Sequence, residues 1–306
     1  VRTRQAALME NLWKWGRSDT VITGSLPEAF ASLDAFFDLI VIDAPCSGEG
    51  MFRKDPFART QWSESLVEQC SSLQANIIDI AWKLLRPGGH LIYSTCTWEP
   101  RENEQHIERL IERGAEHLPI PVDPAWGVVD SGLGLRCYPH WVKGEGLFIS
   151  AVRKPGEREL RDDHLEQPGS LEGPFSAWMQ DPEQQYFSEH DGQVHALSSR
   201  WLDRIQRLAS AVRVLAPGIP VAQRKGKEWV PHAALALNLS LDRNAFPNMD
   251  LDLDGALRFL RGESLSANNA EGRVLMNFDG MPLGWGSGAG NRWNNGWPTN
   301  WRIRMR

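Results

Sequence analysis

The 306-residue sequence has few cysteines and lacks long hydrophobic runs, and both shortages exclude whole classes of protein. It has no run of about 18 or more apolar residues and no secretory signal pattern, so neither a membrane span nor secretion is predicted. The four cysteines lie far apart without a C-x-x-C pair, which argues against a zinc site and against a disulfide framework. We therefore expect a cytoplasmic protein with free thiols, no bound metal and no membrane partner.

The sequence also lacks an initial methionine and an excess of basic residues. It begins at Val1, and residues 1–15 already have the apolar spacing of a helix, so we expect a fragment whose amino-terminal part is missing. The formal net charge of −6 argues weakly against nucleic-acid binding. Basic residues nevertheless outnumber acidic ones over residues 201–306, and a local basic face can bind phosphate whatever the total charge.

What the sequence does contain is a cysteine directly after each of two predicted strands. The segment Asp43-Ala44-Pro45-Cys46-Ser47-Gly48-Glu49-Gly50 follows the apolar run 37–42, and Ser94-Thr95-Cys96-Thr97 follows residues 90–93. Loops at the carboxyl ends of neighbouring parallel strands share one crevice. Two thiols and the Asp43 carboxylate are therefore expected to converge where α/β proteins bind ligands.

Alternating strand and helix patterns predict an α/β domain over residues 1–154. The predicted strands are 20–23, 37–43, a strand from residue 90 and a closing strand at 146–152, and the main predicted helices are about 63–85 and 99–113. From Lys154 the composition shifts to Pro, Gly and charged residues, which predicts a linker and small subdomain over 155–210. Residues 211–306 are expected to form a separate α+β module with a helix at 254–261.

These segments resemble the two cysteine motifs of the Sun/Nop family of RNA cytosine-5 methyltransferases. The resemblance is carried by residues 43–56, by 93–97 and by Glu102-Asn103-Glu104. It is strongest to the bacterial RsmF (YebU) type and continues to the chain's end, where residues 280–302 are similar to PUA-like strands. It implies a Rossmann-like class I methyltransferase domain, truncated at its amino terminus, followed by an α+β PUA-like RNA-binding region.

The resemblance also assigns catalytic roles. Carbon 5 of cytosine is unreactive until a thiolate adds at carbon 6, and a base must later remove the carbon 5 proton. By resemblance, Cys96 is the nucleophile, Cys46 assists release of the product, and Asp43 binds ring nitrogen 3. Cys70 and Cys137 are expected to be packing residues, because an isolated cysteine is usually a small buried side chain.

Substrate and cofactor contacts follow from the same resemblance. Pro45 is expected to offer its carbonyl to the exocyclic amine of cytosine, and Arg53 and Lys54 to meet backbone phosphate. The family uses S-adenosylmethionine, whose glycine-rich binding loop is not in this sequence. We expect Ser25 and Asp43 to contact the cofactor, with Glu28 as an alternative to Ser25, and the chain as given to methylate poorly.

The expected partner is ribosomal RNA or the small ribosomal subunit, bound by a monomer, and the expected activity is methylation of a cytosine in 16S RNA. Three alternatives stay open. The protein could be a non-catalytic RNA-binding or ribosome-assembly protein that keeps the fold, or it could methylate transfer RNA. It could also be a different thiol enzyme, such as a hydrolase that pairs Cys96 with His140.

Overall fold

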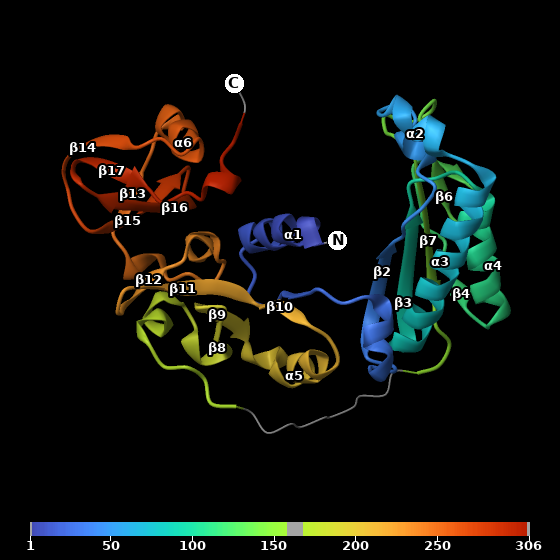
Figure 1. Ribbon diagram of the computed structural model, residues 1–306, viewed down its shortest axis with the longest axis horizontal. Helices are drawn as coiled ribbons and strands as arrows, with labels where there is room; N and C mark the ends of the chain where they lie inside the picture. The colour runs from blue at the N-terminus through green and yellow to red at the C-terminus, as the bar shows by residue number, and fades with distance from the viewer. Residues whose placement is uncertain (1, 158–167, 305–306) are drawn as a thin grey trace. The chain divides into compact units, whose positions relative to one another are not determined.

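The computed structural model describes residues 2–157 and 168–304, and the chain divides into two compact units. The central unit comprises Ser25–Asp162, and the terminal unit comprises Val1–Gly24 together with Asp163–Arg306 (Figure 1). Part of the predicted linker, residues 158–167, lies outside the described residues. No helix in the described part of the chain is both long and apolar enough to span a membrane.

A six-stranded sheet organises the central unit. Its strand order is β2-β3-β7-β6-β5, and β4 pairs with β7. The strands are β2 (Phe37–Asp43), β3 (Leu85–Thr95), β4 (Glu116–His117), β5 (Val129–Asp130), β6 (Leu135–Cys137) and β7 (Leu147–Arg153). β2 and β3 are parallel, as the strand-helix pattern predicted. The strand expected to close the sheet, β7, lies instead in its interior, antiparallel to both β3 and β6.

Two helices cover one face of this sheet (Figure 1). The helices of the unit are α2 (Pro56–Gln61), α3 (Glu64–Leu84) and α4 (Glu104–Glu112). α3 is the crossover between the parallel strands, and it begins where the Ser63 hydroxyl accepts a hydrogen bond from the backbone N–H of Leu66. α3 and α4 bury Ile78, Trp82 and Ile107 in one core with strand residues of the sheet. This packing fixes the carboxyl ends of β2 and β3 side by side.

β2 forms one edge of the sheet. Its side chains Leu39 and Val41 are 51% and 62% exposed. The neighbouring strand β3 begins at Leu85, earlier than the predicted start at His90, because Leu85 is already extended and pairs with Phe37. The register shifts between Phe37 and Leu39, so the segment before His90 forms an irregular start to the strand.

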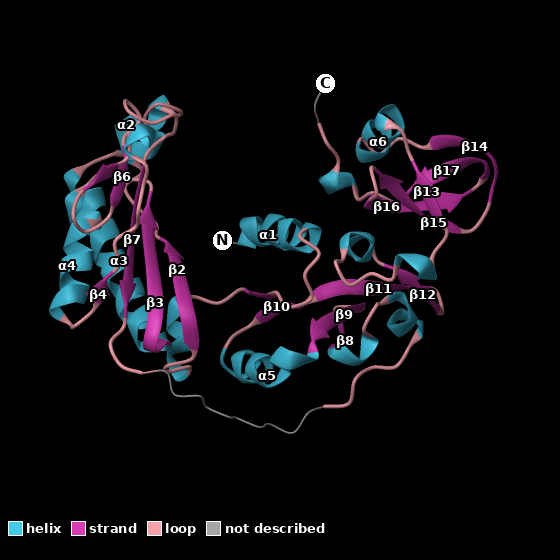
Figure 2. Ribbon diagram, turned by 180° about the vertical axis from the view of Figure 1, so that it is seen from behind, coloured by secondary structure: helices cyan, strands magenta, loops and turns pink. Residues whose placement is uncertain are grey.

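Among the described residues, the strands of the terminal unit form three sheets (Figure 2). β1 (Val21–Thr23) pairs with β10 (Val214–Pro217). The second sheet has the order β12-β11-β9-β8, with β8 (Gln185–His190), β9 (Gln193–Ser198), β11 (Ile219–Lys225) and β12 (Glu228–Pro231). The third has the order β13-β15-β16-β17-β14, with β13 (Asn248–Asp250), β14 (Leu265–Ala270), β15 (Arg273–Phe278), β16 (Met281–Gly288) and β17 (Gly290–Asn295). The helices are α1 (Arg2–Lys14), α5 (Leu202–Ala211) and α6 (Leu253–Leu260).

The structure divides the chain differently from the predicted domains 1–154, 155–210 and 211–306. The strand predicted at 20–23 does not join the parallel sheet, because β1 pairs antiparallel with β10. The predicted boundary at 210 falls inside one folded body, since β9 pairs with β11 and the side chains Phe187, Ile219 and Trp285 share one core. The local sequence pattern located β1 but could not specify a partner so distant in the chain, and it did not predict β9 or β11.

Candidate active site

The two cysteines that follow β2 and β3 lie in contact. The Sγ atoms of Cys46 and Cys96 are 3.1 Å apart. Asp43, the last residue of β2, is in register with Ser94 of β3, so both loops leave the sheet at the same end. The predicted convergence of the two thiols is confirmed, and all four cysteines are free.

Hydrogen bonds join the two cysteine loops along their length. The backbone N–H of Gly50 donates to the carbonyl of Cys96 at 2.8 Å, and the hydroxyls of Ser47 and Thr97 are 3.0 Å apart. The Thr97 hydroxyl donates to the Glu49 carboxylate at 2.8 Å. A Cβ atom at position 50 would come within 2.6 Å of the Cys96 carbonyl oxygen, so only glycine permits this close approach.

The contact between the two thiols shifts their pKa values in opposite directions. A hydrogen bond from Cys46 lowers the pKa of Cys96 to about 7, although burial and the charges of Asp43 and Glu102 oppose this ionisation. The same hydrogen bond, together with burial, raises the pKa of Cys46 well above that of an ordinary thiol. At neutral pH Cys96 therefore has substantial thiolate character, the reactive form of cysteine, while Cys46 keeps its proton.

Two buried polar residues to which the sequence analysis gave no role lie next to the Cys46 loop. The Gln74 amide donates to the Pro45 carbonyl at 2.8 Å and to the Glu102 carboxylate at 2.7 Å. The same carboxylate oxygen of Glu102 accepts a hydrogen bond from the backbone N–H of Ser47 at 3.0 Å. One signal could have found Gln74, because it lies at helical spacing from Val67 and other buried α3 residues and is polar.

The other predicted site residues lie in different surroundings. Asp43 and Pro45 are exposed beside the thiols, and Lys54 is exposed as well. Arg53 donates to the Gly144 carbonyl at 2.7 Å and forms an ion pair with Glu145 at 3.4 Å. Its guanidinium therefore holds a neighbouring loop, which leaves only part of it available to a phosphate.

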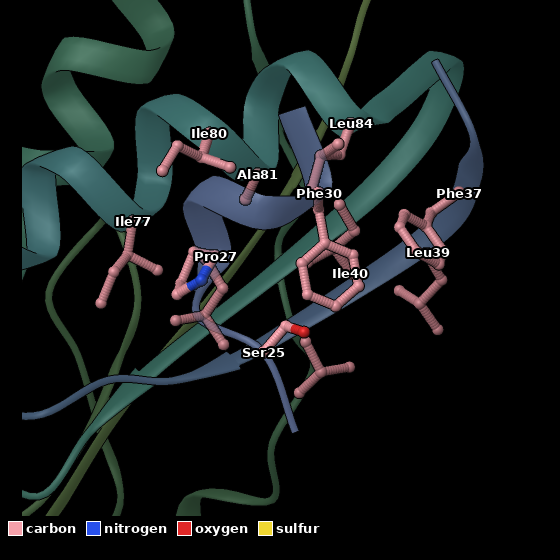
Figure 3. Close-up of a pocket in the computed structure, with 12 residues that line it drawn as sticks. Ser25, Pro27, Phe30, Phe37, Leu39, Ile40, Ile77, Ile80, Ala81 and Leu84 are labelled. Carbon is pink, nitrogen blue, oxygen red and sulfur yellow. The ribbon is translucent and has the colours of Figure 1, made fainter. Parts of the chain in front are cut away.

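Ser25 lines a cavity of about 360 Å³ between β2 and α3 (Figure 3). The rest of the lining is apolar, including Phe30, Leu39, Ile40 and Ile77, and Asp43 is not part of it. The structure therefore does not bring the two predicted cofactor residues into one cavity. An apolar slot with one hydroxyl suits the faces of an adenine ring, but no charged side chain lines it to hold the amino-acid end of S-adenosylmethionine.

The remaining candidates take no part in the thiol contact. His140 is exposed and its ring packs on Trp141, with the centroids 4.8 Å apart, whereas the sulfur of Cys96 is hydrogen-bonded to Cys46. Cys70 and Cys137 are partly buried, and this burial raises the pKa of each thiol. No cluster of His, Cys, Asp or Glu suited to a metal ion occurs among residues 2–157 and 168–304.

Two family models match the chain. Residues 2–153 match the model described as 16S rRNA methyltransferase RsmB/F, and residues 246–303 match the methyltransferase RsmF PUA domain. The first match includes residues 2–24, which the structure groups with the terminal unit. The second covers β13 to β17, the five-stranded sheet.

Curated relatives extend over nearly the whole chain. Ribosomal RNA small subunit methyltransferase F of Erwinia tasmaniensis is 30% identical over 320 residues, which are 97% of this chain and 66% of that protein. The protein of the same name from Aliivibrio fischeri is 28% identical over 319 residues, again 97% and 66%. The solved structure of NSun6 from Pyrococcus horikoshii with SFG is 31% identical, covers 38% of this chain and 30% of its own, and has a TM-score of 0.33.

The chain thus spans about two thirds of the length of the curated relatives that it matches. The predicted family and fold class are confirmed by the two family models, which match in the predicted order. The chain belongs to the RsmB/F family of 16S rRNA methyltransferases and combines a methyltransferase fold with a PUA domain of the RsmF type.

Proposed function

We propose that the protein methylates carbon 5 of a cytosine in 16S ribosomal RNA through a covalent adduct with Cys96. The observation that carries this proposal is the 3.1 Å contact between two thiols on separate loops. The reaction needs one thiolate as a nucleophile and a second group that later accepts a proton. The lowered pKa of Cys96 and the raised pKa of Cys46 suit these two different tasks.

The reaction begins with attack on the base. The thiolate of Cys96 adds to carbon 6 of the cytosine, and a C–S bond forms while the electron pair of the carbon 5–carbon 6 double bond moves into the ring. Asp43 hydrogen-bonds ring nitrogen 3 and stabilises the adduct. The Pro45 carbonyl already accepts from Gln74, but it has a second lone pair for the exocyclic amine of the base.

Release of the product depends on Cys46. S-adenosylmethionine, when bound, supplies the methyl group. Cys46 releases its own proton to solvent, and its thiolate then removes the carbon 5 proton, the carbon 5–carbon 6 double bond returns, and the C–S bond breaks to release the Cys96 thiolate. The Cys46 proton is held mainly by the hydrogen bond to Cys96 and by burial, so the pKa of Cys46 falls once Cys96 is bonded to carbon and that hydrogen bond is lost.

Substrate recognition must bring a base out of its stack, because both thiols have to reach one cytosine ring. Lys54 and the free part of the Arg53 guanidinium contact backbone phosphates beside it. The partner is 16S RNA or the small ribosomal subunit, bound by a monomer in the cytoplasm. The PUA domain contributes further RNA contacts.

The test compares wild type, Cys46→Ala and Cys96→Ala, each made in the full-length protein, incubated with S-adenosylmethionine and small-subunit RNA and analysed on denaturing gels. We expect Cys46→Ala to accumulate an RNA-protein adduct and Cys96→Ala to lose both adduct and methylation. Cys70→Ala is the matched control and should behave as wild type. RNA binding without methylation in wild type would favour the non-catalytic alternative, and methylation of transfer RNA alone would replace the proposed substrate.

A further inference from the structure

A fully buried glutamine contacts the Cys46 loop from α3. Gln74 is 0% exposed, and both N–H groups of its amide are used, one on the Pro45 carbonyl at 2.8 Å and one on Glu102 at 2.7 Å. A buried polar side chain is tolerated only when its hydrogen-bonding groups are satisfied. Its position therefore depends on the loop, and the loop's position depends on it.

The oxygen of this amide has a third partner, His106. The pKa of His106 is lowered to about 4 by burial, so its ring is neutral near pH 7. Its Nε2 atom lies 3.1 Å from the Gln74 carbonyl oxygen. Since that oxygen can only accept, His106 carries its proton on Nε2 and donates it. The Pro45 carbonyl can only accept, so the amide nitrogen of Gln74 lies towards the loop and the amide oxygen towards His106.

Glu102 extends the support of Gln74 to the other side of Cys46. Its carboxylate oxygen Oε2 accepts from both Gln74 and the backbone N–H of Ser47, at 2.7 and 3.0 Å. Its own backbone is held in turn, since the Tyr93 hydroxyl donates to the Glu102 carbonyl at 2.7 Å. The residue before Cys46 is thus bound by Gln74 directly, and the residue after it is bound through Glu102.

We propose that Gln74 is a positioning residue that sets the Cys46 thiol against Cys96. Its importance for methylation rests on the proposed function, but its effect on the distance between the two thiols does not. Pro45 is exposed, and the backbone at Gly48 adopts a φ of 77° that few residues favour. Without the two hydrogen bonds from Gln74, the loop would lose its anchor to α3 at Pro45 and the support of Glu102 behind Ser47.

The test measures how readily the two thiols form a disulfide in the 306-residue chain. Glutathione disulfide oxidises Cys46 and Cys96 to one protein disulfide and is itself reduced to two molecules of glutathione, so the equilibrium reports the effective concentration of one thiol at the other. The variants are Gln74→Met, which removes both donors, and Gln74→Asn, which keeps the amide but shortens its reach. Gln69→Met, at an exposed position on the same helix, is the matched control.

We expect the effective concentration to fall about tenfold in Gln74→Met, because two hydrogen bonds of ordinary net strength are lost. Gln74→Asn should lie between this variant and wild type, and Gln69→Met should equal wild type. A second readout is the pH dependence of Cys96 alkylation by iodoacetamide. It should move to higher pH in Gln74→Met, because Cys46 no longer donates steadily to Cys96.

An unchanged disulfide equilibrium and alkylation profile in a folded Gln74→Met would overturn the proposal. Thermal unfolding establishes that the variant is folded, and if Gln74→Met does not fold, the same two readouts on Gln74→Asn decide. Neither readout involves RNA or methyl transfer. A lower effective concentration together with no trapped adduct in Cys46→Ala would therefore leave Gln74 in its role and reject the methyltransferase mechanism.

Discussion

The two cysteine segments are held in place by different means. Around Cys96, the side chains of Thr95, Thr97 and Asn103 are fully buried. They hold one another, since the Thr95 hydroxyl donates to the side-chain oxygen of Asn103 at 2.6 Å and the side-chain nitrogen of Asn103 donates to the Thr97 backbone carbonyl at 3.0 Å. The Cys46 segment is more exposed, and it is held by the side chains of Gln74 from α3 and of Glu102. Cys96 thus lies on a segment whose own buried side chains bind one another, whereas Cys46 lies on a segment held by residues from other parts of the chain.

The largest loss of stability is expected when a nearly buried charge beside the Cys96 segment is removed. Arg136 donates to the Trp98 carbonyl at 2.6 Å and forms a nearly buried ion pair with Glu104. Arg136→Met should lower the free energy of unfolding, measured in urea, by about 3–5 kcal/mol, because Glu104 is left buried without a counter-charge. Arg153→Met breaks an exposed pair with Glu116 and should cost about 0–1 kcal/mol. Equal costs would contradict the buried anchoring of the Cys96 segment.

A methyl group inserted between the two segments should separate them. In Gly50→Ala the new Cβ would meet the Cys96 carbonyl oxygen at 2.6 Å, so the loops must move apart. We expect the free energy of unfolding to fall by about 1–3 kcal/mol, as for other overpacked sites. Gly144→Ala is the control, since no heavy atom lies within 4 Å of a Cβ at that position. Gly50→Ala should be less stable than Gly144→Ala, and equal stability would contradict the close approach of the two loops.

The chemical difference between the thiols should appear in the pH dependence of alkylation. Only the thiolate reacts, so alkylation of Cys96 should rise as the pH increases through about 7, its lowered pKa. Cys46→Ala removes the hydrogen bond that lowers this pKa, and reaction at pH 7 should fall about tenfold if the pKa rises by one unit. Cys46→Ser keeps a donor and should stay close to wild type. Mass spectrometry of the alkylated protein measures all three, and an identical profile in Cys46→Ala would show that the contact does not tune Cys96.

The smallest effect is expected from the charge of Glu102. Its carboxylate opposes ionisation of Cys96, whereas a glutamine of the same shape would not. Glu102→Gln should therefore shift the alkylation profile to lower pH, with about twofold to threefold faster reaction at pH 6. Glu68→Gln, at an exposed position of α3, should leave the profile in place. A shift to higher pH in Glu102→Gln would mean that loss of loop support outweighs loss of charge.

Local patterns predicted much of the central unit. The apolar spacing predicted a helix over 63–85, and α3 spans Glu64–Leu84. The rule that loops at the carboxyl ends of parallel strands share one crevice predicted that Cys46 and Cys96 lie close together, as they do. These features depend on residues close in sequence or on a general rule of topology. The partner of β1 could not be predicted in the same way, because its hydrogen bonds are made by β10, far along the chain.

The contacts of Gln74 with the Cys46 loop were not predicted, for a related reason. Gln74 lies on the buried face of α3, where a polar residue signals that some partner exists but not which one. Its partners, Pro45, Glu102 and His106, come from three other segments of the chain. The role of Arg53 was also incompletely predicted, since its contact with the Gly144 carbonyl joins residues from different loops. Such contacts are properties of the folded chain and have no local signature.

The exposed edge of β2 has a practical consequence for the protein in solution. A strand at the edge of a sheet offers backbone N–H and C=O groups to any other strand, and Leu39 and Val41 make this edge apolar as well. Charged residues and prolines are the usual protection against self-association at such an edge. Here two of the outermost side chains are aliphatic, so the tendency of this chain to aggregate should rise steeply with its concentration.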